Sequence, residues 1–336
     1  MVKIKRALIS VYNKNNLKDI LKVFKKFNVD VISSGGTFKE IKKLGFKSKE
    51  VSSITGYPEI LNGRVKTLHP NIHGGILSKR KNKTHKKNLR ENNIPEIDII
   101  IVNFYPFEKV LFKTKNENKI IENIDIGGPA MVRAAAKNFN DVVVITNTNQ
   151  YKELINILKK NNCSTPIDYR KRMAQKAFSL TSHYDILISN YFDKFNKTNF
   201  PQRKFISLNL KEELRYGENP HQSSSLYSES EIGLIKLSGK QLSYNNYSDI
   251  FSSLKISRSL EKNVGCVIVK HGNPCGVSIE KNAINSFKSA LNCDPISAFG
   301  GVVSFNFKVK ENLARELNKI FLEVIVANGF EASALK

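Results

Sequence analysis

The feature that most constrains this fold is a mostly apolar run without alternation at residues 97–103 (IDIIIVN). A strand with one solvated face alternates apolar and polar residues, whereas a strand covered on both faces does not. The run therefore predicts a central strand of a parallel sheet that carries helices on both faces.

Strands and helices are predicted to alternate around this run. The apolar residues of segment 15–26 recur at a helical spacing, and Gly45 is a typical residue after a helix end. This alternation with short turns is typical of a doubly wound parallel sheet in an α/β domain. We predict strands at Arg6–Val11, 29–33 and 142–145, and helices at 15–26, 38–44 and 129–138.

A second α/β domain is expected after a long helix at Ile167–Phe195 and a polar stretch at 193–204 that contains Pro201. We therefore divide the chain into domains at 1–195 and 204–336. The second domain is expected to be incomplete, since the sequence stops as a new helix begins. We predict its strands at Gly265–Lys270, 301–305 and 323–327, and its helices near 250–260, 283–291 and 311–320.

The charge is strongly positive, since 54 Lys and Arg against 30 Asp and Glu give +24. Such a chain can bind nucleic acid, acidic membranes or small anions. The lysines are spread along the sequence, and no zinc-finger spacing or RNA-recognition motif is present. We therefore expect no nucleic-acid or membrane partner, and a nucleic-acid-binding protein is kept only as a minor alternative. Without an apolar run of membrane-spanning length or a signal peptide, a cytoplasmic location is expected.

No metal site is predicted. The four cysteines form no C-x-x-C pair and are expected to be reduced thiols. His69 and His73 are four residues apart, but Pro70 and the Gly74-Gly75 pair argue against a regular helix there. No acidic residue occupies the position that an H-E-x-x-H motif requires.

Two segments of the first domain are candidate anion sites. Ser34-Gly35-Gly36-Thr37 lies between a predicted strand and a helix, where glycine lets the backbone approach an anion and free amides face it. A plain tight turn is the alternative. Arg64 and Lys66 lie in an irregular segment and suit phosphate or carboxylate.

Tyr105 and Asp125 are candidates because of where they lie. Tyr105 follows the central strand, and sites in open α/β sheets lie beyond the carboxyl ends of strands. Asp125 precedes the Gly127-Gly128 turn, and Arg133 and Lys137 share a face of the following helix. These groups could perform acid–base chemistry; a capping aspartate beside a solvated basic face is the alternative.

In the second domain, His271 at a predicted strand end is the best general-base candidate, because its ordinary pKa lies nearest neutrality. We expect residues 270–276 to form a loop there. The zinc-deaminase signature is not met, since Asn273 and Ser278 replace its glutamate and second cysteine.

The order and spacing of these motifs carry a family resemblance that covers the chain from Lys5 to Lys336. It closely resembles the bifunctional AICAR transformylase/IMP cyclohydrolase family. The resemblance is carried by SGGT, GRVKTLHP, HGGIL, NFYPF, NIDIGGPAMVRAAAKN, RYGENPHQ, LSYNN, VKHGNPCG and DPISAFGG, in that order.

For the first domain, the resemblance implies a methylglyoxal-synthase-like fold and an IMP cyclohydrolase that closes formyl-AICAR to IMP with loss of water, without a cofactor or metal. Lysine and tyrosine donors would stabilise the oxyanion, and aspartate with lysine would move protons. The family's catalytic positions match Lys66, Tyr105, Asp125 and Lys137. Its nucleotide-binding positions match Lys14, Ser34, Gly36, Thr37, Arg64, Thr67, Gly127 and Gly128.

For the second domain, the resemblance implies a cytidine-deaminase-like AICAR transformylase, with 10-formyltetrahydrofolate as co-substrate. His271 would take the amine proton, and Lys270 would stabilise the formyl oxygen. The purine nucleotides AICAR, formyl-AICAR and IMP are the implied ligands, and a homodimer is the implied assembly. Substrate-binding positions match Arg215, Tyr216, Asn245, Asn273, Ser297, Phe299 and Gly300.

Three departures from the family pattern are present. The family continues well beyond this length, so we expect a truncated transformylase that is inactive as this chain alone. Tyr12 stands where the family usually has a small hydroxyl residue, and Asn328 where it usually has proline. The alternative function is a non-catalytic purine-nucleotide-binding remnant.

Overall fold

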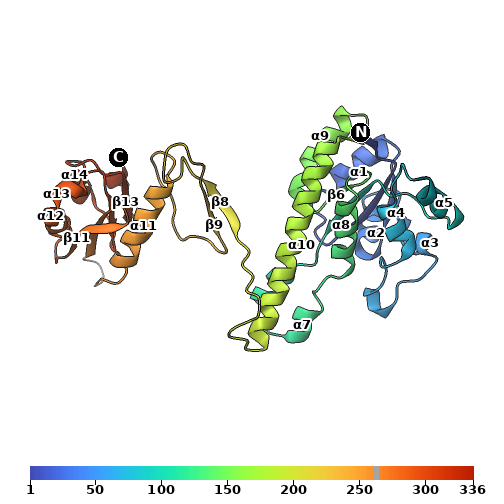
Figure 1. Ribbon diagram of the computed structural model, residues 1–336, viewed down its shortest axis with the longest axis horizontal. Helices are drawn as coiled ribbons and strands as arrows, with labels where there is room; N and C mark the ends of the chain where they lie inside the picture. The colour runs from blue at the N-terminus through green and yellow to red at the C-terminus, as the bar shows by residue number, and fades with distance from the viewer. Residues whose placement is uncertain (261–264) are drawn as a thin grey trace. The chain divides into compact units, whose positions relative to one another are not determined.

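A computed structural model describes residues 1–260 and 265–336 of the chain. It contains two compact units, Met1–Ile206 and Ser207–Lys336 (Figure 1). The long helix predicted from the sequence is present as α10 (Ile167–Phe195) and lies in the first unit. Among the described residues, no helix combines the length and apolar character needed to cross a membrane.

The first unit is built on a five-stranded sheet in the order β4-β3-β2-β5-β6. Every neighbouring pair is parallel, which confirms the predicted doubly wound sheet. The chain runs from the central strand β2 through β3 to the edge strand β4. It then returns to the centre as β5 and ends at the other edge as β6. The strands are β2 (Arg6–Val11), β3 (Asp30–Ser33), β4 (Lys49–Glu50), β5 (Ile99–Asn103) and β6 (Val143–Ile145).

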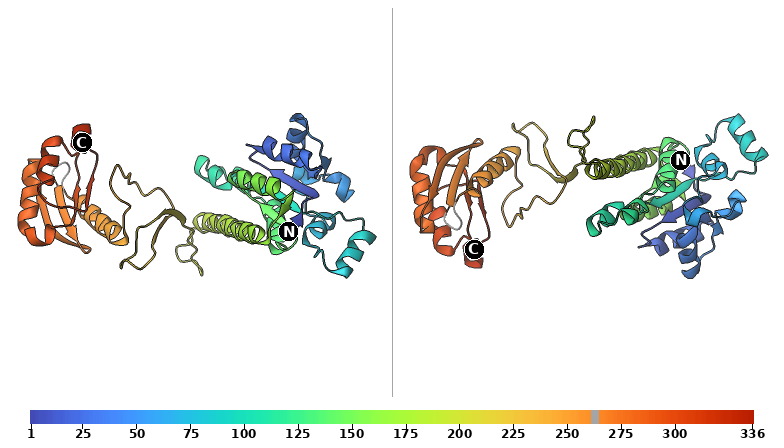
Figure 2. Two further views of the ribbon diagram at one scale, coloured as in Figure 1. Left: turned by 90° about the horizontal axis from the view of Figure 1, so that it is seen from above. Right: turned by 90° about the horizontal axis from the view of Figure 1, so that it is seen from below.

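Helices cover both faces of this sheet (Figures 1 and 2). On one side α1 packs against α9, and on the other α8 packs against α4, α10, β5 and β6. The residues of the central strand from Ile99 to Val102 are at most 1% exposed, as its apolar run predicted. The helices are α1 (Leu17–Lys26), α2 (Gly35–Lys43), α3 (Ser52–Thr55), α4 (Pro70–Leu77), α5 (Lys83–Glu91), α6 (Phe107–Lys113), α7 (Glu117–Ile121), α8 (Gly127–Lys137) and α9 (Tyr151–Lys160).

The expectation that Pro70 and the glycines exclude a regular helix was wrong, because α4 occupies that segment. Proline is favourable at the first helical turn, where its missing amide costs nothing. His69 caps the helix, and its Nδ1 accepts a 3.1 Å hydrogen bond from the Asn71 amide. Gly75 allows close packing, since a Cβ there would lie 2.3 Å from the Pro95 carbonyl oxygen.

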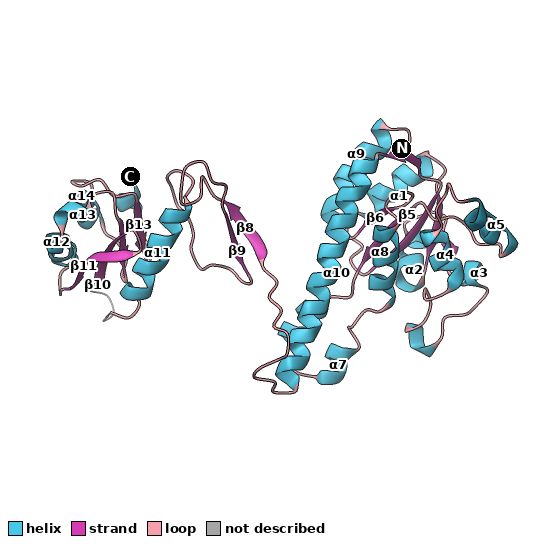
Figure 3. Ribbon diagram, viewed as in Figure 1, coloured by secondary structure: helices cyan, strands magenta, loops and turns pink. Residues whose placement is uncertain are grey.

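The second unit contains a four-stranded sheet in the order β11-β10-β12-β13 (Figure 3). β10 is antiparallel to both neighbours, whereas β12 and β13 are parallel. A separate hairpin, β8 (Asn209–Glu213) with β9 (Ser225–Ser228), precedes it. The sheet strands are β10 (Gly265–Lys270), β11 (Asn273–Ile279), β12 (Val302–Phe305) and β13 (Val324–Ala327).

Helices pack on both faces of this second sheet. Val302 clusters with Ile250 and Leu254 of α11, whereas its neighbour Val303 clusters with Phe287 of α12 and Leu313 of α14. Successive strand residues point to opposite faces, so α11 lies on one face, and α12 with α14 on the other. The helices are α11 (Tyr244–Ser257), α12 (Ala283–Cys293), α13 (Pro295–Ala298) and α14 (Glu311–Leu317).

The segment 270–276, expected as a loop, is a tight hairpin. The chain turns at His271-Gly272, both with positive φ, and returns as the edge strand β11. An edge strand tolerates Pro274 because one side of its backbone needs no partner.

Candidate functional site

The first candidate site lies where the strand order of the first unit reverses, at the carboxyl ends of β2 and β5. There the Asn103 side chain accepts a 2.8 Å hydrogen bond from the Asn13 amide and donates one of 3.1 Å to its carbonyl. A cavity of about 810 Å³ opens beside these strand ends, and Tyr12, Lys14 and Tyr105 line it. Ligands of open α/β sheets bind at this topological position.

The amino end of α2 forms an anion cradle at the same edge. The helix begins at Gly35, three residues earlier than predicted, so the glycine turn is its first turn. Ser34 is 6% exposed, and its Oγ has no hydrogen-bond partner among the described residues. A Cβ built on Gly36 would lie 3.9 Å from Nζ of Lys14. Free amides, an unpaired hydroxyl and an ammonium group together suit a phosphate.

Thr37 has a structural task in this cradle. It is 4% exposed, and its Oγ1 accepts from the Val11 amide at 3.0 Å and donates to the Val11 carbonyl at 3.1 Å. These bonds fasten the first turn of α2 to the end of β2. The side chain is therefore already paired, unlike that of Ser34.

Lys66 lies between the cradle and the acidic part of the site. Its Nζ is 3.8 Å from Oε1 of Glu59 and 3.4 Å from the position of a Cβ on Gly35. Its charge also acts on Asp125 and opposes the rise in the pKa of that carboxyl. Lys66 therefore joins the anion cradle to Asp125.

Asp125 sits at the amino end of α8. Its carboxylate accepts a 2.8 Å hydrogen bond from the Gly128 amide and a further bond from the Tyr105 amide. Burial raises the pKa of this carboxyl, and the two amides and Lys66 oppose the rise. A partly buried carboxyl with a raised pKa is a suitable proton acceptor or donor.

Thr67 and Gly127, both predicted site residues, meet at this end of α8, whereas the predicted Arg64 is ion-paired with a residue outside the site. Thr67 is 4% exposed, and a Cβ on Gly127 would lie 2.7 Å from its Oγ1. Arg64 is paired with Glu122, and both side chains are more than half exposed.

Lys137 is not brought to this group. It is the last residue of α8, ten residues beyond Gly127, which corresponds to about 15 Å along the helix. It lines a separate pocket with His73 and Arg133. Its catalytic role stays a prediction.

The second candidate site surrounds the β10–β11 turn of the second unit. Nζ of Lys270 donates to the carbonyl oxygens of Phe299 at 3.1 Å and Gly300 at 2.7 Å. Gly300 has a φ of 68°, and a Cβ there would lie 2.8 Å from Nζ of Lys270. His271 follows with a φ of 53°, a left-handed conformation that L-residues rarely adopt. Such strain is often found at functional sites.

Helix α11 contacts this turn through Asp249, which the sequence analysis did not single out, and carries the predicted Asn245. Asp249, 8% exposed, accepts a 2.6 Å hydrogen bond from the Gly272 amide. One helical turn earlier, Asn245 donates to the Glu218 carbonyl at 3.1 Å. Asn273 lies beside the turn and donates to the carbonyl of His271 at 3.2 Å.

Arg215, Tyr216 and Ser297 complete the predicted set. The Arg215 guanidinium lies 4.6 Å from the Tyr216 ring centre and donates a 2.7 Å hydrogen bond to its hydroxyl. The Tyr216 carbonyl accepts from the Tyr244 amide at the start of α11. Ser297 donates to Asp294 through its amide at 2.9 Å, and bonds from Ser297 lower the pKa of that carboxyl.

The sequence analysis missed three residues that contact these sites. Glu59 pairs with Lys66, Asp249 holds the Gly272 amide, and Tyr184 holds the Asp125 amide. Asp249 and Tyr184 lie far from their partners in the sequence, and Glu59 meets Lys66 across a local turn closed by the Ile60–Val65 bridge. Among the described residues, no three His, Cys, Asp or Glu side chains are arranged to hold a metal ion.

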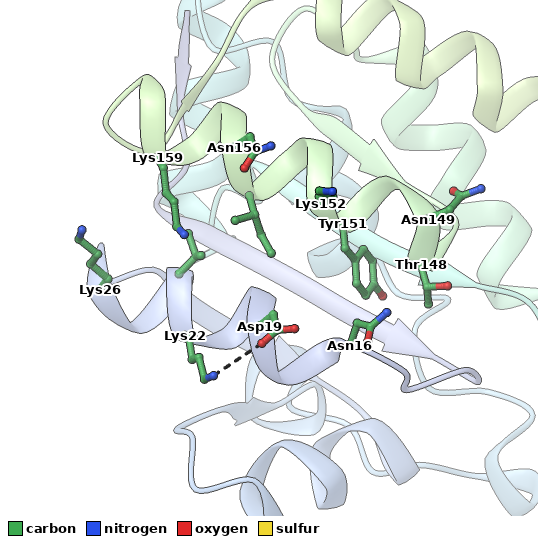
Figure 4. Close-up of a pocket in the computed structure, with 12 residues that line it drawn as sticks. Asn16, Asp19, Lys22, Lys26, Thr148, Asn149, Tyr151, Lys152, Asn156 and Lys159 are labelled. Carbon is green, nitrogen blue, oxygen red and sulfur yellow. Dashed lines mark ion pairs between the residues drawn. The ribbon is translucent and has the colours of Figure 1, made fainter.

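Another groove lies between α1 and α9 (Figure 4). It has a volume of about 830 Å³, and Lys159 and Tyr151 extend from α9 toward α1. Lys22 is ion-paired with Asp19 on its wall at 3.6 Å. It contains none of the residues predicted for either site.

Comparison with known proteins assigns the chain to a family. The model of the "AICARFT/IMPCHase bienzyme" matches residues 135–336, and that of the "MGS-like domain" matches residues 16–130. The bifunctional purine biosynthesis proteins PurH of Clostridium botulinum strain Hall and Clostridium perfringens strain 13 are both 45% identical to the chain. Each alignment covers 99% of this chain and 67% of the relative.

A solved structure gives a weaker likeness. The crystal structure of ForH is 28% identical, with a TM-score of 0.51, and the match covers 56% of this chain and 96% of ForH. The family match is consistent with the parallel sheet of the first unit and with the motifs in both units. The chain belongs to the AICAR transformylase/IMP cyclohydrolase family of bifunctional purine biosynthesis enzymes.

Proposed function

We propose that the first unit closes formyl-AICAR to IMP at the carboxyl edge of its sheet. The observation that carries this proposal is the grouping of Lys66 and Asp125 around the amino ends of α2 and α8. The site offers an anion cradle and an acid–base pair within one compact region. A phosphorylated nucleotide that must gain and lose protons needs both.

The substrate phosphate is proposed to bind at the amino end of α2. The Ser34 hydroxyl, the amides of the glycine turn and Nζ of Lys14 would be its donors. Thr67 and the Gly127-Gly128 turn would contact the rest of the nucleotide. Arg64 would exchange Glu122 for the ligand.

Ring closure needs a substrate nitrogen to attack the formyl carbon. A C–N bond forms, the formyl oxygen becomes an oxyanion, and the nitrogen loses a proton. The oxyanion takes up a proton and becomes a hydroxyl group. This hydroxyl takes up a second proton and leaves as water, while a ring nitrogen loses its remaining proton to form the C=N bond of IMP. Lys66 and Tyr105 would stabilise the oxyanion, and the Asp125 carboxyl would accept and return protons.

We propose that the second unit binds AICAR and carries the residues that in the family transfer a formyl group to its amine from 10-formyltetrahydrofolate, a step that the sequence analysis expects this chain alone not to complete. His271 would take the amine proton, and Lys270 would stabilise charge on the formyl oxygen. The contacts of Lys270 with the 299–300 turn support this, because that turn carries two other predicted substrate contacts. As in the family, the protein would act as a homodimer in the cytoplasm.

The test is a spectrophotometric assay of IMP formation from formyl-AICAR by the purified chain, without folate. Turnover that Lys66→Ala lowers about 10²- to 10³-fold would support the proposal for the first unit. Binding of formyl-AICAR without any turnover would overturn it. A second assay with AICAR and 10-formyltetrahydrofolate tests the other unit, and His271→Ala is the matched variant.

A further inference from the structure

Tyr184 lies on α10, remote in sequence from the proposed cyclohydrolase residues, yet its hydroxyl reaches the backbone beside one of them. The hydroxyl accepts a 2.7 Å hydrogen bond from the Asp125 amide and donates one of 3.2 Å to the Asn123 carbonyl. Two backbone groups of the loop before α8 are thus fixed by one side chain. No other hydrogen bond to these two backbone groups is found within the described residues.

The ring of Tyr184 is itself firmly placed. It is 5% exposed, and its centre lies 5.0 Å from that of Phe104 and 6.0 Å from that of Phe107. These phenylalanines flank Tyr105, whose amide donates to the Asp125 carboxylate. Tyr184 therefore contacts both segments that meet at the site, the 104–107 segment through its ring and the 123–125 loop through its hydroxyl.

We infer that Tyr184 is a positioning residue, which sets the Asp125 carboxylate against the Tyr105 segment for the cyclisation. A carboxyl that exchanges protons with a bound substrate must lie within hydrogen-bond reach of the reacting atom. Displacement of such a group by about 1 Å can cost 10²-fold in rate. Burial raises the pKa of Tyr184 to about 12, so its hydroxyl stays protonated at neutral pH and keeps donating to Asn123.

The test compares Tyr184→Phe with Tyr191→Phe in the full chain. Tyr191 is on the same helix and in the same aromatic cluster, with its ring centre 6.1 Å from that of Phe107, but it makes no hydrogen bond to the Asp125 loop in the described structure. We expect Tyr184→Phe to lower kcat for IMP formation about 10-fold with a less than 2-fold change in KM. Tyr191→Phe should leave both constants within 2-fold of the wild type.

A double-mutant cycle separates positioning from general loosening of the fold. In an Asp125→Asn background, Tyr184→Phe should lower kcat less than 2-fold, because the group that it positions is already lost. An undiminished 10-fold loss in that background would overturn the inference. Equal effects of Tyr184→Phe and Tyr191→Phe in the wild-type background would also overturn it.

This inference rests on the proposed cyclohydrolase activity. The experiment must therefore distinguish a failure of the positioning role from a failure of the proposed function. If the wild-type chain makes no IMP, the proposed function fails. The positioning role is then read from the ¹³C resonance of the Asp125 carboxyl, titrated with pH in both tyrosine variants. Its titration should change with Tyr184→Phe and not with Tyr191→Phe, and an unchanged titration in both would refute the role.

Discussion

The carboxylate of Asp125 accepts a 2.8 Å hydrogen bond from the amide of Gly128, in the first turn of α8. This contact places a negative charge at the positive end of a helix, where it is stabilised. Burial nevertheless disfavours the charged form, and it raises the pKa of the carboxyl above its ordinary 3.8. Stability and reactivity therefore oppose each other at Asp125.

Asp125→Asn should lower kcat for IMP formation about 10²-fold or more, because an amide cannot exchange protons. It should not lower the free energy of unfolding at pH 7, because asparagine can still accept from Gly128. Since the folded-state pKa is raised, the contribution of Asp125 to stability is present below pH 3.8 and is lost as the pH rises through the folded pKa. Urea unfolding at several pH values checks this.

The sign of that pH dependence provides the decisive comparison. The stability of the variant relative to wild type should increase from pH 3.5 toward neutrality, about the range in which carboxyls ionise. A variant that instead loses relative stability toward neutral pH would contradict the raised pKa.

Lys66→Ala should lower kcat about 10²- to 10³-fold, the usual loss for removing one oxyanion donor. Its effect on the free energy of unfolding should stay below about 1 kcal/mol, since the side chains of Lys66 and Glu59 are 24% and 42% exposed. Steady-state kinetics and thermal unfolding measure the two effects. Lys43→Ala, an exposed lysine at the end of α2, is the control and should change neither.

Sequence reasoning succeeded where a local pattern fixes the structure. The apolar run of β5 predicted the central strand because burial on both faces removes the alternation. It failed at α4, where the glycines were taken as evidence against a helix. Gly75 is needed there for close packing against Pro95, which is distant in sequence. It failed at β11 because Pro274 argues against a strand unless the strand is known to lie at an edge.

The candidate sites divide in the same way. Ser34 and Asp125 stood out because they lie in motifs near predicted strand or helix ends, and Lys66 because it lies with Arg64 in an irregular segment. Tyr184 contacts Asp125 only through tertiary packing, and Glu59 meets Lys66 across a turn that the sequence analysis did not predict; neither lies in a pattern that indicates function. Lys137 is the opposite case. It lies in a motif that matches the family, but α8 places it about 15 Å along the helix from Gly127.

Gly128→Ala should disturb the site from the helix side. A Cβ there would lie 2.6 Å from Oδ2 of Asp125, so the carboxylate must move. We expect kcat to fall at least 10-fold with a smaller change in KM. Gly74→Ala in α4 is the control, because its Cβ would meet only the side chain of Ile94, at 3.3 Å from Cδ1 and 3.6 Å from Cγ2. Full activity of Gly128→Ala would show that the position of Asp125 is not critical.

Gly276→Ala should destabilise the second unit severely. A Cβ on this residue of β11 would lie 1.9 Å from the carbonyl oxygen of Ala290 in α12, and backbone atoms cannot turn aside as a side chain can. The strand and the helix must separate, which should cost about 3 kcal/mol or more. Val277→Ala, on the same strand at a 38% exposed position, should cost less than about 1 kcal/mol.

Calorimetry of the full chain should show a lower-temperature transition in Gly276→Ala alone, while the IMP assay reports whether the first unit still works. Equal transition temperatures for the two variants would mean that α12 packs less tightly on β11 than the structure indicates.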